Sequence, residues 1–188
     1  MPFDYMNESG DGTGWFIDRA TGDAVYLDQN TEVVRIDKAT RAMSWANGTQ
    51  TVERTEKVSL TAAEIGALAA SPKELVAAQG ANKVIEFVSA YMQLNDDGTD
   101  YDDAASDGDL VIKHVDGDGV AVSAAIDGDG FIDATAEAFA RFLPIAVATG
   151  TVAQLENTAL VLDNNGAEFT TGTRTAEVFV TYRVHDVS

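Results

Sequence analysis

The stretch of sequence closest to a known chemical motif is Asp127-Gly128-Asp129-Gly130-Phe131-Ile132-Asp133. Alternating carboxylates around a glycine are typical of the calcium-binding loop of an EF-hand. If Gly130 is placed at the glycine of such a loop, Ala125 and Ala136 occupy the first and last ligand positions, so both anchoring carboxylates are missing. We therefore predict no metal site and expect a turn here. The nearest candidate ligands are Asp127, Asp129 and Asp133.

A second acidic segment runs from Asn95 to Gly119 and holds nine aspartates against a single lysine, Lys113. Calcium accepts about six to eight oxygen ligands in flexible geometry, so aspartate-rich loops can bind it without a fixed spacing. A calcium-stabilised binding module is therefore one alternative function. The more usual interpretation of such a run is a solvated loop.

The sequence contains no motif for any other catalytic chemistry. The sequence has no cysteine, which excludes disulfides, thiolate metal sites and cysteine nucleophiles. The two histidines, His114 and His185, lie outside any zinc-site or catalytic pattern. We expect both to be surface or packing residues. A hydrolase that uses paired carboxylates stays open as an alternative, but nothing selects two of the 31 acidic residues. We expect no enzyme.

Composition narrows the range of partners. The formal net charge is -19, from 31 acidic against 12 basic residues. Such a surface repels nucleic acid and anionic membranes, because binding to phosphate depends on lysine and arginine. No segment approaches the roughly 18 apolar residues needed to span a bilayer, and the N-terminus lacks the pattern of a secretory signal. We therefore expect synthesis in a cytoplasm without export, with no nucleic-acid or membrane partner.

The sequence divides into three predicted regions, whose strands and helices would position any site. Residues 1–14 are polar and glycine-rich, and we expect a flexible arm. Residues 15–55 predict a β-hairpin region and a linker, in which the turns Asp18–Thr21 and Asp37–Thr40 share an Asp-x-Ala-Thr pattern. Residues 56–188 predict the main domain, which is β-rich.

The stretch from Val58 to Leu94 carries the most specific local signals. Thr61 and Glu64 form a capping box that predicts a short helix. Ser71, with Pro72 after it, predicts the start of a second short helix, and Gly80 predicts its end.

A long strand from Val84 to Leu94 should follow that glycine. Its apolar residues fall on both faces, which predicts a position near the centre of a sheet, buried between two layers.

The remaining pattern predicts further strands and one helix. We expect strands at Leu110–Val115, Val120–Ile126 and Leu155–Leu162, and a helix at Asp133–Leu143. The final strand, Thr175–Val184, alternates cleanly, but Phe179 interrupts its polar face and is an interaction candidate. The fold class predicted is α+β and β-rich: an antiparallel sandwich or barrel with two or three short helices, preceded by the hairpin region.

Several segments in this order resemble a module of structural proteins from tailed bacteriophages. They are SLTAAEI, GAL, ASPKELVAAQGANKVIEFVSAYMQL, DLVIKHVDGDG, AAIDGDGFIDATAEAFARFLP, ENTALVLDNNGAEFTTG and TAEVFVTYRV. The hairpin region before Thr51 lies outside the resemblance. The resemblance implies a virion protein on the outer capsid surface that decorates or cements the head. Its implied partners are the major capsid protein and further copies of itself in a homotrimer.

One alternative within the virion is a tail or fibre component that contacts host glycans. Exposed aromatic side chains would then serve as stacking platforms for sugar rings. The interaction candidates of this kind are Trp15, Tyr26 and Trp45.

Overall fold

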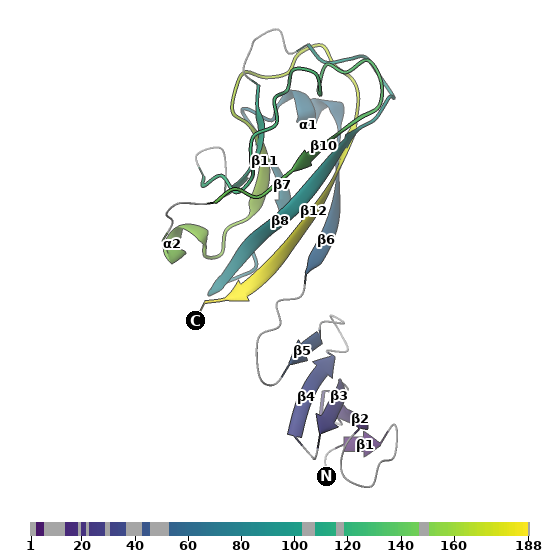
Figure 1. The fold of residues 1–188 in the computed structure, drawn as a ribbon, viewed down its shortest axis with the longest axis vertical. Coiled ribbons are helices and arrows are strands. Elements are labelled where there is room, and N and C mark those ends of the chain that lie inside the picture. Colours follow the sequence, from purple (N-terminus) through teal and green to yellow (C-terminus); the bar gives the residue numbers. More distant parts are fainter. Residues whose placement is uncertain are drawn as a thin grey trace. The chain divides into compact units, whose positions relative to one another are not determined.

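The computed structural model describes residues 3–5, 14–18, 20–21, 23–28, 31–36, 43–45, 53–102, 108–115, 119–146 and 151–187. The chain divides into two compact units, residues 1–52 and residues 53–188 (Figure 1). Within the described ranges, the strands form three antiparallel sheets, one in the first unit and two in the second.

The first unit is a five-stranded sheet in which each strand pairs with the next along the chain. Its strands are β1 (Phe3–Tyr5), β2 (Gly14–Asp18), β3 (Ala24–Asp28), β4 (Thr31–Ile36) and β5 (Met43–Trp45). Val25 and Leu27 form its buried cluster. Residues 3–5 were expected in a flexible arm, and they instead pair with β2 at the edge of this sheet.

The turn between β2 and β3 closes as its sequence predicts. The Asp18 carboxylate accepts a hydrogen bond of 2.9 Å from the Ala20 amide. Arg35 on β4 donates to the carboxylates of Asp18 and Asp23 at 2.8 and 3.0 Å. Hydrogen bonds from Arg35 and Ala20 lower the pKa of Asp18. The similar turn predicted at Asp37–Thr40 lies outside the described residues.

The second unit contains a four-stranded sheet in the order β10-β8-β12-β6 and a three-stranded sheet in the order β7-β11-β9. Its strands are β6 (Arg54–Leu60), β7 (Lys73–Val76), β8 (Lys83–Leu94), β9 (Leu110–His114), β10 (Ala138–Phe142), β11 (Leu160–Asn164) and β12 (Ala176–Asp186). The helices are α1 (Ala62–Gly66) and α2 (Val152–Leu155). The predicted class is confirmed: β-rich and antiparallel, with short helices.

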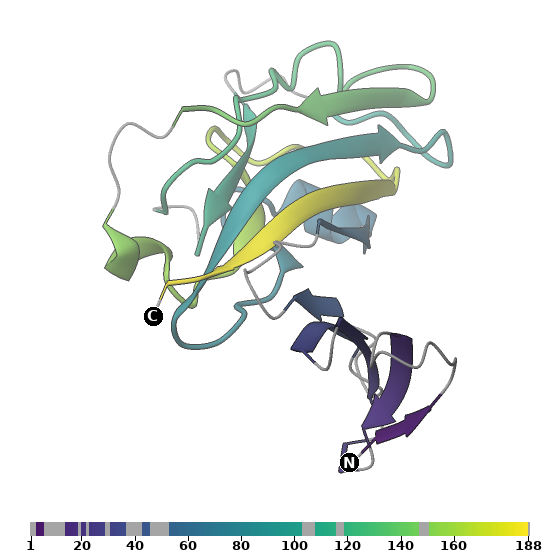
Figure 2. The ribbon, with the colours of Figure 1, turned by 60° about the horizontal axis from the view of Figure 1, so that its bottom comes forward.

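One hydrophobic cluster draws on both sheets of the second unit, so the core lies between them. Met92 on β8 and Val178 on β12 represent the four-stranded sheet, and Ile112 on β9 and Leu162 on β11 represent the other. Figure 2 shows β8 and β12 running side by side as the longest strands of the unit. These two strands form the centre of the four-stranded sheet and hold its edge strands in place.

β8 is central as predicted, but only one of its faces is buried. Ile85 and Phe87 are buried near its start, and Ala90, Met92 and Leu94 near its end. The register with β12 shifts here, since Tyr182 pairs with Phe87 whereas Thr181 pairs with Ser89. Such a bulge inserts one residue and reverses the alternation. The buried apolar residues of β8 therefore line a single face, although in the sequence the apolar positions seemed to occupy both.

The capping box at α1 is confirmed. The Glu64 amide donates to the Thr61 hydroxyl at 3.3 Å, and the Thr61 amide donates to the Glu64 carboxylate at 2.8 Å. The second helix, predicted to begin at Ser71, is wrong, because β7 occupies that segment and pairs with β11. Burial of Leu75 and Val76 against the core outweighs the local helix signals.

Gly80 follows β7 in a left-handed conformation with φ of 97°, which a glycine adopts without strain. Its amide donates to the Asn157 side chain at 2.9 Å, so the turn into β8 is tied to the segment that follows α2.

The helix predicted at Asp133–Leu143 is also wrong. β10 occupies Ala138–Phe142 and pairs with β8, with Phe142 opposite Ala90. Within β10, Phe142 is buried and Phe139 is exposed. Which of the two side chains faces the core is decided by the pairing with β8, and not by the sequence of β10 alone. Val120–Ile126, predicted as a strand, forms isolated bridges to β9 at Ala121 and Ile126.

Candidate interaction surface

The surface with the most unusual composition is the side of the four-stranded sheet that faces away from the core, here called the outer face. The strand register aligns one row across all four strands: Arg141 on β10, Tyr91 on β8, Phe179 on β12 and Lys57 on β6. A neighbouring row contains Phe139, Gln93, Glu177 and Ser59. Because these side chains stand on paired strands, the sheet backbone fixes their spacing.

The β10 side of the outer face is apolar and solvent-exposed. Phe139 is 77% exposed and Tyr91 is 43% exposed. Leu143 and Ile145, just beyond β10, are exposed as well. A shallow hollow beside Phe139 is lined by Gln93, Glu137 and Ala138. Exposed aromatic side chains gathered in one place are typical of a contact site for another molecule.

Two cations border the aromatic row. The Arg141 guanidinium lies 5.3 Å from the centre of the Tyr91 ring, and the Lys57 ammonium lies 5.6 Å from the centre of the Phe179 ring. Lys57 also forms an ion pair of 2.6 Å with Glu177. Each exposed cation–π contact contributes about 0.5–1 kcal/mol. The contacts restrain the aromatic rings and place positive charge beside them in an otherwise acidic protein.

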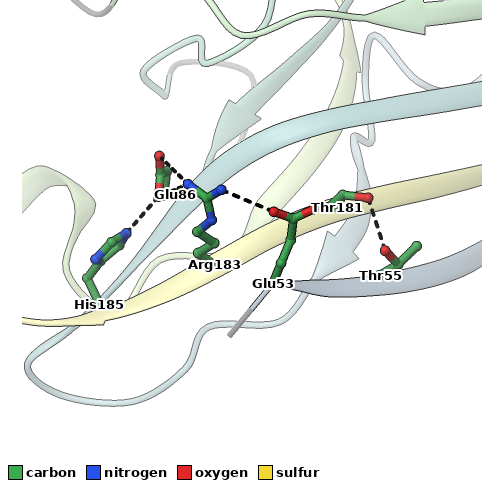
Figure 3. A network of polar contacts seen from close by, with 6 residues as sticks. All are labelled: Glu53, Thr55, Glu86, Thr181, Arg183 and His185. Carbon is green, nitrogen blue, oxygen red and sulfur yellow. Dashed lines mark hydrogen bonds and ion pairs between the residues drawn. The ribbon is translucent and has the colours of Figure 1, made fainter. Parts of the chain in front are cut away.

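The β6 side of the outer face is polar, and Figure 3 shows its network. The hydroxyls of Thr55 and Thr181 lie 3.0 Å apart. Arg183 donates to the Glu53 carboxylate at 3.1 Å and to Glu86 at 3.5 Å. Next to them, a ring nitrogen of His185 lies 2.8 Å from the Glu86 carboxylate.

Electrostatics favour the charged forms of Glu86 and Arg183. The hydrogen bond with His185, and then the positive charge of Arg183, lower the pKa of Glu86. The hydrogen bond to Glu53, together with Glu86, raises the pKa of Arg183. Glu86 and Arg183 therefore stay ionised at neutral pH, and their ion pair stabilises the pairing of β8 with β12.

The aromatic residues predicted as interaction candidates are divided between the two units. Phe179 lies on the outer face, half-buried between Tyr91 and Lys57. Trp15 and Tyr26 lie on paired strands of the first unit, with ring centres 5.5 Å apart in an edge-to-face arrangement. The side chain of Trp45, in β5, lies outside the described residues. The structure thus brings Trp15 and Tyr26 together.

Two of the three candidate metal ligands, Asp127 and Asp133, close turns. Asp127 accepts a hydrogen bond of 3.0 Å from the Asp129 amide, and Asp133 accepts one of 2.7 Å from the Gly130 amide. Within the described ranges, no group of three or more His, Asp or Glu side chains is arranged to hold a metal ion. None of the helices in the described part of the chain is long and apolar enough to cross a membrane.

Part of the acidic segment is organised by a buried arginine that the sequence did not single out. Arg174 is 2% exposed and forms ion pairs of 2.8 Å with both Asp96 and Asp100. It also donates to the backbone carbonyls of Ala134 and Ala136 at 2.5 and 3.1 Å. A solvated loop was expected here, whereas this arginine fixes the first part of the segment to the body.

Tyr101 reinforces the same attachment. Its hydroxyl donates to the Arg174 carbonyl at 2.6 Å, and its ring is buried beside Gly172. A Cβ at Gly172 would lie 2.0 Å from that ring, so the contact needs glycine. Burial, with a smaller contribution from Asp97, raises the pKa of Tyr101 to about 12.

The histidines lie in structural positions. His114 is buried on β9, its ring nitrogen 2.9 Å from the Thr158 hydroxyl, and burial lowers its pKa. Beside it, Lys113 and Asp163 form a buried ion pair of 2.6 Å. His185 belongs to the polar network of the outer face.

Phe139, Tyr91 and Arg141 were not identified from the sequence as surface residues. Two of them fall in the segment predicted as a helix, and Tyr91 lies beyond the bulge that reverses the alternation of β8. The signal available was the strand-like alternation of Phe139, Arg141 and Leu143 with smaller or buried neighbours.

Comparison with known proteins adds little. No family model matches the chain, and no curated protein matches it. A solved structure described as "Capsid of Ralstonia phage GP4" aligns at 15% identity over 73% of this chain and 86% of the other, with a TM-score of 0.36. A TM-score this low does not establish a shared fold, and no function follows from it.

Proposed function

We propose that this protein is a structural component of a tailed-phage virion that binds the major capsid protein and decorates or stabilises the head. The observation that carries the proposal is the exposed aromatic patch on the β10 side of the outer face. The patch contains Phe139 and Tyr91, and Leu143 and Ile145, just beyond β10, are exposed as well.

The patch is attached to a rigid support. β10 pairs with β8 over its whole length, and Phe142 on the same strand is fully buried opposite Ala90. A side chain such as Phe139 therefore enters an interface with little conformational entropy left to lose, apart from its own rotamer. Protein–protein interfaces depend on a few such rigid aromatic anchors.

Charge supports the same function. A body with a net charge of -19 on the outside of a particle opposes aggregation between particles. The aromatic row nevertheless includes Arg141 next to Tyr91. That cation would complement carboxylates or carbonyl oxygens at the edge of an apolar site on a partner.

The phage-like segments of the sequence also form the body that carries the patch. They include β8, β9, β11 and β12 and the α1 cap. A cement protein needs a stiff body and a contact face, and the second unit supplies both.

The test is the location of the protein in purified particles. Heads and tails separated from disrupted virions should contain the protein in the head fraction, and purified protein should rebind to heads that lack it. Its absence from purified particles would overturn the proposal. Its presence in tails alone would do so too, and would favour the alternative of a tail component that contacts glycans.

A further inference from the structure

β6 forms the edge of the four-stranded sheet opposite β10. Among the described strands it pairs with β12 alone, so its other side carries backbone groups that no described strand takes up (Figure 1). An edge of this kind can accept a further strand. Charged side chains usually prevent such pairing, because like charges then meet.

On this edge, however, the charges are ordered so that opposite charges meet when the strand pairs with a copy of itself. The segment Glu53–Lys57 reads Glu-Arg-Thr-Glu-Lys, and all five residues are exposed. Suppose that the same segment of a second copy runs antiparallel to it, with Thr55 opposite Thr55. Arg54 then lies opposite Glu56, and Glu53 lies opposite Lys57. Every charged residue then faces an opposite charge, and each pair forms twice.

Symmetry leaves few other registers. A twofold axis perpendicular to a sheet pairs residues that point to the same face, so the axis must pass beside one residue of the strand. With the axis at Arg54, two arginines face each other, and with the axis at Glu56, two glutamates do. Thr55 is the one centre within this segment that avoids a like pair.

We propose that β6 pairs antiparallel with β6 of a second copy of this chain, around a twofold axis at Thr55. The two four-stranded sheets then continue into one sheet across the axis. This assembly is a dimer, in place of the homotrimer implied by the phage resemblance. It goes beyond the proposed capsid binding and uses the opposite edge of the sheet from Phe139.

The side chains are already oriented for this contact. Thr55 and Glu53 point to the outer face, where they meet Thr181 and Arg183 (Figure 3). The side chains of Glu53 and Lys57 remain 51% and 50% exposed despite their partners Arg183 and Glu177. Each therefore has room for a second, intermolecular partner.

The net charge of the protein determines the ionic strength and concentration at which the dimer should be measured. Two bodies of charge -19 repel each other, but at physiological ionic strength charges interact mainly within about 8 Å. The local pairs at the edge then outweigh the distant charges. The contact area of one short strand is small, so we expect a weak dimer that forms at high protein concentration.

The test uses charge reversal in the full chain and sedimentation velocity over a concentration series. Arg54→Glu places glutamates at positions 54 and 56, and Glu56→Arg places arginines there. Each variant alone should lose at least about tenfold in dimer affinity, because like charges now face each other. An equimolar mixture should form a heterodimer, since every residue again meets its opposite.

The control is Asp129→Arg, which changes the net charge as Glu56→Arg does but lies in an exposed turn far along the chain. It should dimerise like the unchanged protein. The proposal is overturned if the unchanged protein stays monomeric up to millimolar concentration, or if both variants dimerise as it does. It is also overturned if the mixture of variants stays monomeric, because only the Thr55 register predicts rescue.

Discussion

The two edge strands of the four-stranded sheet differ in what they present to solvent. β10 presents Phe139, with Leu143 beyond its end, whereas the start of β6 and the residue before it, Glu53–Lys57, carry two acidic and two basic side chains around Thr55. Both strands belong to one sheet and offer the same kind of backbone hydrogen bonds. In the two contacts that we propose, the side chains alone therefore select the partner: an apolar site on a different protein at β10, and a second copy at β6.

The two edges are connected through the sheet. The row from Arg141 through Tyr91 and Phe179 to Lys57 crosses all four strands, and a cation lies over an aromatic ring at each end. A rigid row of this kind keeps the two edges at a fixed separation. The following experiments test whether the edges act as separate sites on one stable body.

The largest expected effect comes from the two phenylalanines of β10. Phe142→Ala should lower the free energy of unfolding by about 3–5 kcal/mol, because the side chain is fully buried in the core. Phe139→Ala should cost less than about 1 kcal/mol, because its side chain is 77% exposed. Urea unfolding of both variants measures the difference. Equal costs would mean that Phe139 is part of the core and not a contact residue.

The next effect concerns binding at the same edge. Phe139→Ser should weaken binding to heads at least about tenfold while leaving the urea midpoint nearly unchanged, as expected for an aromatic anchor. Val152→Ser on α2 is the matched control, because Val152 is an exposed apolar residue, at 53%, on another element. Quantitative co-sedimentation with heads measures both. Retained binding by Phe139→Ser would remove β10 from the contact.

A smaller effect is expected where β6 leads into α1. Thr61→Ala removes the cap and should cost about 0.5–2 kcal/mol of unfolding free energy. Ser71→Ala, at the helix start that the structure does not contain, should change it by less than about 0.5 kcal/mol. Thermal unfolding of the two variants compares them. A larger loss at Ser71 would contradict the assignment of β7.

The smallest effect is a pH dependence at the same place. Hydrogen bonds from Lys73, and then from Thr61, lower the pKa of Glu64 from 4.5 to about 2. Because the folded-state pKa is the lower one, this stabilisation is present above pH 4.5 and is lost as the pH falls toward 2. Thermal unfolding from pH 5 to pH 2 should show a smaller decline for Glu64→Gln than for the unchanged protein. Identical declines would contradict the role of this carboxylate.

Local signals predicted those parts of the fold in which sequence neighbours decide the structure. The capping box at Thr61 forms within a few residues, and the alternation of β12 survives because its inward residues meet a continuous core. The turn at Asp18 closes on its own backbone. At the capping box and at the turn, the residues that stabilise the element are also close in sequence, and the alternation of β12 was readable because it has no exception on its inward side.

The rest depended on distant partners. Residues 133–143 contain good helix formers, but pairing with β8 makes Ala138–Phe142 a strand, and β8 lies far earlier in the chain. Ser71 and Pro72 form a helix start by local rules, yet burial of Leu75 and Val76 makes β7. The aromatic row could not be predicted for the same reason, since its members come from four strands aligned by the sheet. The charge order of Glu53–Lys57 was present in the sequence, but its meaning required the knowledge that β6 is an edge.

The most direct test of the central claim is cryo-electron microscopy of heads saturated with the purified protein. The account predicts ordered density in which β10 and the Phe139 side of the outer face lie against the major capsid protein, while β6 points away from that contact. Density with the outer face turned to solvent, or heads that carry none of the protein, would contradict it.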